Sequence, residues 1–119
     1  MIHCVFQRDD NLVEIRLKER DDDISCQVMY SKDGKTWRYA SIYPEIDSEF
    51  MLNGCDFLWE QGQTLGTVRL YNKENKMVFW NYFLDLGPYM GSVKLKVTFI
   101  TQKGLYEEVQ DIEIKDRGV

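Results

Sequence analysis

Short runs in which apolar and polar residues alternate extend over most of the chain. Val13, Ile15 and Leu17, for example, are separated by two charged residues. Because successive side chains of a β-strand point to opposite faces, this period of two predicts strands with one apolar and one polar face. Turn residues separate the runs, and the pattern predicts strands at 2–8, 13–18, 24–30, 36–43, 64–71, 77–84, 92–99 and 105–115.

Three segments depart from simple alternation. From Met77 to Leu84 nearly every residue is apolar or aromatic, which predicts a central strand covered on both faces, followed by a glycine-flanked loop at 85–91. In the last strand the apolar positions change parity between Val109 and Ile112, which predicts a β-bulge. Residues 45–63 are irregular and fit either a short strand followed by a loop or a loop with one helical turn.

The predicted strands define the expected fold class. Eight or nine short strands joined by turns, without a helix of substantial length, predict an all-β, two-layer antiparallel β-sandwich of immunoglobulin-like or jelly-roll type. A closed β-barrel is the alternative. A chain of 119 residues has a common single-domain size and can bury one substantial core, so residues 1–119 are expected to form a single domain.

Charge and hydropathy exclude some classes of partner. Fifteen basic residues stand against twenty acidic ones, a net charge of -5, and no segment concentrates Lys or Arg as nucleic-acid binding requires. No run approaches the ~18 consecutive apolar residues that span a membrane, and the chain begins without a secretory signal pattern. We therefore expect no nucleic-acid or membrane partner, and a cytoplasmic location if the chain is complete as printed.

Residues that carry catalysis or bind metals are few. His3 is the one histidine, and the three cysteines, Cys4, Cys26 and Cys55, lie at wide spacing. They match neither a disulfide framework nor a zinc-ligand pattern, and they weakly favour a reducing compartment. The acidic turn 21–23 offers oxygen ligands for Ca²⁺ but lacks the full loop pattern of a calcium motif. We predict no enzyme activity, no catalytic residues, no metal site and no cofactor.

One hairpin carries a family resemblance. Its Asp33-Gly34 pair suits a tight turn, because glycine adopts a positive φ without steric cost. The segment 30–37 reads Tyr-Ser-Lys-Asp-Gly-Lys-Thr-Trp and resembles a hairpin of bacterial carbohydrate-active and adhesion modules, including discoidin-like carbohydrate-binding modules and fibronectin type III domains. It also resembles a shortened Asp-box of sialidase propellers, but a single copy cannot build a propeller. In those families the motif is usually scaffold, so the resemblance implies a β-sandwich more than sugar binding.

Aromatic residues supply the candidate binding site. The chain has three Trp, seven Tyr and six Phe, and exposed aromatic rings stack on sugars or anchor protein interfaces. Trp59 in the irregular segment and Tyr89 in the Gly-Pro-Tyr loop are the best candidates for exposure, and Trp37 and Tyr39 share one strand face and could form a platform. Trp80 is expected in the core.

These observations favour a non-catalytic binding module that recognises a carbohydrate or a protein surface through its loop aromatics. The alternative is a small acidic cytosolic interaction protein of the inhibitor, immunity or phage type. The hairpin motif and the aromatic residues favour the first hypothesis, and the free cysteines favour the second. A homodimer through an unpaired sheet edge is a further expectation.

Overall fold

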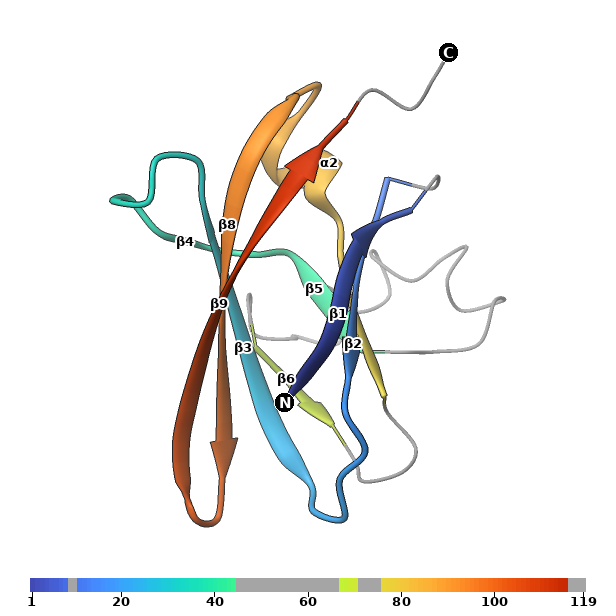
Figure 1. Ribbon diagram of the computed structural model, residues 1–119, viewed down its shortest axis with the longest axis vertical. Helices are drawn as coiled ribbons and strands as arrows, with labels where there is room; N and C mark the ends of the chain where they lie inside the picture. Colours follow the sequence, from blue (N-terminus) through green and yellow to red (C-terminus); the bar gives the residue numbers. More distant parts are fainter. Residues whose placement is uncertain (9–10, 45–66, 71–75, 116–119) are drawn as a thin grey trace.

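Two antiparallel sheets face each other across an apolar core (Figure 1). The computed structural model describes residues 1–8, 11–44, 67–70 and 76–115. These include one short helix, α2 (Tyr82–Leu86), and the strands β1 (Ile2–Gln7), β2 (Val13–Leu17), β3 (Ile24–Ser31), β4 (Arg38–Tyr39), β5 (Ile42–Pro44), β6 (Thr67–Leu70), β7 (Met77–Trp80), β8 (Gly91–Thr101) and β9 (Gly104–Ile114). The predicted β-sandwich is confirmed, and the closed barrel is wrong because the sheets stay separate.

Each sheet combines strands that are consecutive in the sequence with strands that are far apart in it. Sheet A has the order β1-β2-β7-β5, and sheet B has the order β4-β3-β8-β9, with β6 also pairing with β3. Every pairing is antiparallel. Among the described residues, no helix is long and apolar enough to cross a membrane.

The alternating residues meet in the core as expected. The apolar sides of β2, β3 and β8 are buried, including Val13, Ile15, Val28 and Val97, none of which is exposed to solvent. Trp80 is also fully buried, as predicted, and its ring stacks on Tyr30 with centroids 5.3 Å apart. Burial of these side chains removes apolar area from water and supplies the main drive for folding.

The predicted strand at 36–43 is wrong as a single element, because the chain changes sheets within it. β4 belongs to sheet B and β5 to sheet A, with buried Ala40 and Ser41 between them. The backbone N–H of Ala40 donates to Val28 of β3 (3.0 Å), whereas the carbonyl of Ser41 accepts from Asn81 after β7 (3.0 Å). Consecutive residues thus bond to opposite sheets.

The predicted central strand at 77–84 is correct only as far as Trp80. Asn81 then begins α2, and its side-chain oxygen accepts a hydrogen bond from the N–H of Leu84 (3.1 Å). Asparagine is a favoured N-cap because it satisfies an N–H that has no partner within the helix. The N-cap therefore ends the predicted strand at Trp80, although the apolar run continues. The helix α2 takes up the rest of that run and the first two residues of the predicted loop.

The predicted bulge in the last strand is also wrong. The β8–β9 pairing continues without a shift from Gly91 opposite Ile114 to Thr101 opposite Gly104. Leu105 and Val109 lie on the outer face of sheet B, 70% and 50% exposed. The change of parity therefore arises because these apolar residues lie on the solvent face. It does not mark an inserted residue. A register shift occurs instead in β1, between Ile2 and Cys4.

The first and last strands lie side by side and join the two sheets along one side. The backbone N–H of Ile2 donates to the Glu108 carboxylate (3.0 Å). Farther along, the Gln7 side chain accepts from the N–H of Lys115 (2.9 Å) and donates to its carbonyl (3.0 Å). The side chains of Gln7 and Glu108 thus provide the bonds that a neighbouring backbone would make in a closed sheet.

Candidate functional site

The loop between β3 and β4 and the helix α2 both lie at the upper end of the sandwich in Figure 1. A cavity of about 300 Å³ is lined by residues of this hairpin and of α2. Its lining comes from the end of β3, the hairpin loop, the start of β4 and the helix. It consists of Tyr30, Ser31, Lys32, Asp33, Thr36, Arg38 and Asp85. Six of these seven residues belong to one hairpin, so a local segment forms most of the site.

Asp33 organises the hairpin loop. Its Oδ1 accepts hydrogen bonds from the Ser31 hydroxyl (2.9 Å) and from the N–H groups of Lys35 and Thr36 (2.8 Å each). The bond from Thr36, followed by those from Lys35 and Ser31, lowers the pKa of Asp33 to about 2. Gly34 has φ 77°, a conformation that favours glycine. Asp33 lines the cavity, and among the described residues no side chain or other residue's backbone donates to its Oδ2.

Asp85 anchors the opposite wall. Its Oδ2 accepts from the Ser41 N–H and from the Trp80 indole N–H, and its Oδ1 accepts from the Ser41 hydroxyl, all at 2.7 Å. These bonds connect α2 to the start of β5 and the end of β7. The carboxylate therefore contributes negative charge to the cavity, while protein donors already occupy both of its oxygens.

Tyr30 forms the floor between the two walls. The residue is buried, and its ring packs on Trp80. Burial raises the pKa of the Tyr30 hydroxyl, the charge of Asp85 raises it further, and the charge of Arg38 opposes them. The hydroxyl thus remains a neutral donor at physiological pH. Within the described part of the chain it makes no hydrogen bond.

Two cations complete the lining. The exposed Arg38 pairs through its backbone with Tyr30, and its guanidinium makes no ion pair with any described residue. Lys32 lies with its ammonium group 5.6 Å from the centre of the Tyr89 ring. Tyr89 thus lies beside the cavity, and its hydroxyl donates to the carbonyl of Ser92 (3.0 Å).

The three predicted binding residues that the structure describes do not gather in one place. Tyr89 is beside the cavity, whereas Tyr39 is on the outer face of sheet B, 47% exposed, because it pairs with Met29, which lies between the buried residues Val28 and Tyr30 of β3. Trp37 is on the same outer face, where the Lys96 ammonium lies 4.2 Å from its ring centre. A Trp37–Tyr39 platform would therefore be separate from the cavity. Trp59 is outside the described residues.

The acidic turn 21–23 borders a second hollow, of about 410 Å³, formed with Ile24, Ser25 and residues 100–102. Across the described ranges, no three His, Cys, Asp or Glu side chains are placed to hold a metal ion.

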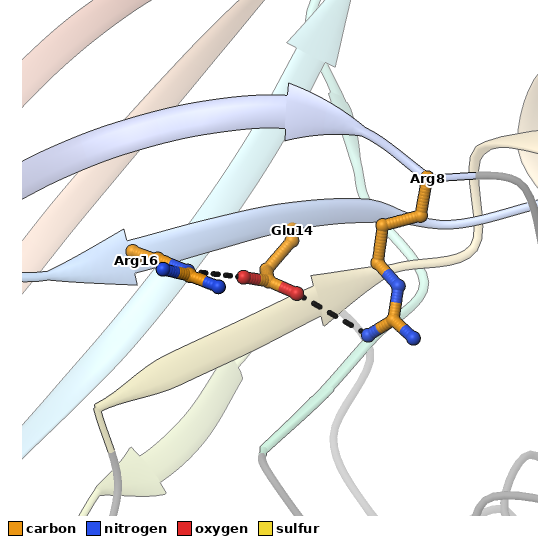
Figure 2. Close-up of polar contacts among 3 residues, drawn as sticks. All are labelled: Arg8, Glu14 and Arg16. Atoms are coloured by element: carbon orange, nitrogen blue, oxygen red, sulfur yellow. Dashed lines mark hydrogen bonds and ion pairs between the residues drawn. The ribbon is translucent and has the colours of Figure 1, made fainter.

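A buried carboxylate on the outer face of sheet A is structural. Figure 2 shows Glu14 between Arg8 and Arg16. Glu14 accepts from Arg8 Nη1 at 3.2 Å and from Arg16 Nε, and its side chain is almost fully buried. Arg16 also lies over the Phe6 ring and Arg8 over the Phe79 ring. Each oxygen of Glu14 has a cationic partner, so the buried charge is compensated within the cluster.

The sequence predicted the loop of the cavity but missed two of its lining residues. The Asp-Gly turn was the signal for the hairpin, whereas Arg38 and Asp85 stood out by no motif. The available signal for Asp85 was Asn81, whose N-cap starts the helix and turns Asp85 toward Ser41 and Trp80. Comparisons with protein-family models, curated proteins and solved structures found no match to the chain.

Proposed function

We propose that this chain is a non-catalytic binding module that takes a carbohydrate in the cavity between the β3–β4 hairpin and α2. The observation that carries the proposal is a set of polar groups on the residues lining that space for which the described part of the chain provides no hydrogen-bond or ion-pair partner: Asp33 Oδ2, the Thr36 hydroxyl, the Tyr30 hydroxyl and the Arg38 guanidinium. A sugar hydroxyl both donates and accepts, so a wall with acceptors and donors is its complement. The volume is at the lower end of the roughly 300–1,000 Å³ range of small-molecule sites and suits a single sugar unit.

The rigidity of the walls supports the same function. Asp33 is fixed by three donors and Asp85 by three others. A preorganised site loses less conformational entropy when it binds, which matters for a ligand that offers only a few hydrogen bonds. Tyr89, beside the cavity, adds an aromatic surface for the apolar side of a sugar ring.

An NMR titration tests the proposal. The labelled domain is titrated with pooled plant, bacterial and host oligosaccharides, and saturable amide shifts are expected at residues 30–38 and 85–89. Thr36→Val and Tyr30→Phe keep the shape of the walls and remove one hydroxyl each, so each variant should weaken binding. Thr98→Val on the outer face of sheet B is the matched control. The absence of saturable shifts with every pool would reject carbohydrate binding at this site.

A protein-binding role is the second candidate, and exposed apolar residues on the outer face of sheet B favour it. Ile100 and Leu105 lie opposite each other near the β8–β9 turn, and Val109 lies farther along β9. All three are more than two-fifths exposed. Aliphatic groups on a solvent face can anchor a protein partner. If so, Leu105→Glu should abolish capture of that partner while leaving the cavity titration unchanged, and capture that persists in the variant would exclude this face.

A further inference from the structure

The free groups of the cavity have an excess of hydrogen-bond donors. Three protein donors occupy Oδ1 of Asp33, and three others occupy the two oxygens of Asp85. Oδ2 of Asp33 is therefore the carboxylate oxygen left for a ligand. The donors in the lining are more numerous: the Arg38 guanidinium with five N–H bonds, the Lys32 ammonium and the hydroxyls of Tyr30 and Thr36. A ligand that satisfies these groups must be rich in acceptors.

Arg38 is placed to provide most of that excess. Its backbone pairs with Tyr30, so the two side chains belong to the same side of the β3–β4 hairpin. Tyr30, Arg38 and Asp85 all line the cavity, so the guanidinium stands in the same space as the Tyr30 side chain. A guanidinium binds a carboxylate through two parallel hydrogen bonds, and this planar geometry is specific to Arg.

We propose that the sugar bound in this cavity is an acidic one, with its carboxylate held by Arg38 and the Tyr30 hydroxyl and its ring hydroxyls held by Asp33 Oδ2 and Thr36. The inference rests on the proposed carbohydrate-binding function. Tyr89, whose ring lies beside the Lys32 ammonium, would pack against the sugar ring. Arg38 is thus the residue that selects an acidic sugar over its neutral counterpart.

A matched pair of ligands tests the selection. A pool of hexuronate oligosaccharides is compared with the same pool after chemical reduction of each carboxylate to a primary alcohol, which preserves linkage and ring configuration. Dissociation constants come from amide shifts. The acidic pool should bind about tenfold or more tightly, the contribution of one net charge-assisted hydrogen bond.

Two variants at one position separate charge from geometry. Arg38→Gln should equalise the two pools, and Arg38→Lys should restore only part of the preference, because an ammonium group lacks the planar fork. Lys103→Gln, which removes the same charge near the β8–β9 turn, is the control and should keep the full preference.

Each remaining outcome overturns a defined part of the inference. If both pools bind equally to the unmodified domain, the acidic preference is wrong and carbohydrate binding stands. If neither pool nor any neutral oligosaccharide produces saturable shifts, both proposals fail. If Arg38→Gln retains the full preference, Arg38 is not the selecting residue.

Discussion

Removal of the Asp85 side chain should destabilise the fold far more than removal of an exposed carboxylate. It accepts hydrogen bonds from the Ser41 N–H, the Ser41 hydroxyl and the Trp80 indole N–H, all at 2.7 Å. The chain crosses from sheet B to sheet A at Ser41, and Trp80 is the largest fully buried side chain among the described residues. Asp85→Ala therefore leaves donors without partners at the place where the two sheets are joined.

The size of the effect follows from these contacts. A hydrogen bond to a charged group contributes about 1.5–3 kcal/mol, and a buried donor left unpaired costs about 1–3 kcal/mol. The three bonds share one carboxylate and do not add fully, so we expect Asp85→Ala to lower the free energy of unfolding by about 3–5 kcal/mol. That is a large share of the roughly 5–15 kcal/mol typical of a domain. Asp85→Asn should lose about half as much, because its NH₂ group faces a donor.

Urea unfolding followed by circular dichroism measures the change in stability. The indole N–H signal of Trp80 gives a local readout and should lose its protection from hydrogen exchange in Asp85→Ala. Asp111→Ala is the control, since its side chain is 71% exposed and forms one surface ion pair with Lys94, which should contribute less than about 1 kcal/mol. Equal losses in the two variants would refute the role assigned to Asp85.

Three further side chains give independent tests. The pKa of Asp33 is about 2, below its ordinary 3.8. The contribution of this carboxylate to stability is therefore present above pH 4 and lost as the pH falls toward 2. A ¹³C carboxyl titration with a midpoint near 3.8 would contradict this. Burial raises the pKa of Cys26 to about 12, so iodoacetamide should modify it only after unfolding, and mass spectrometry of native protein that finds the modified Cys26 peptide would count against the packing described. Glu14→Gln weakens the bonds to Arg8 and Arg16, which can regain water, and should lower stability by about 1–2 kcal/mol in urea unfolding; an unchanged midpoint would show that the ion cluster contributes nothing.

The alternating segments were predictable because the burial of one strand face in the sandwich produces the alternation directly. In β2, β3 and β8 the apolar side faces the other sheet and the polar side faces away. Burial of one face imposes a period of two on the sequence, and a shift by one residue would expose the entire apolar set. Five long or regular strands therefore appeared at nearly their observed bounds.

The errors arose where alternation carries no information. The period of a strand says which residues share a face but not which sheet the strand joins, so the crossing at Ala40 and Ser41 was not visible. An apolar run does not distinguish a strand from a short helix, and the cap at Asn81 decided that case. Both errors prevented prediction of the cavity, because it forms where the hairpin meets a helix that the sequence did not predict.

The side-chain hydrogen bonds between the first strand and the end of the chain constrain how the molecule can be made. Gln7 bonds to Lys115 across 108 positions of the chain, so this side of the sandwich can close only after β9 has left the ribosome. Until then β8 has an unpaired edge, and the growing chain carries exposed apolar strands. Contacts of such long range slow folding and extend the time in which those strands can pair with another molecule. We therefore expect chain synthesis, rather than the loss of any single contact, to be the stage at which this protein is most vulnerable to aggregation.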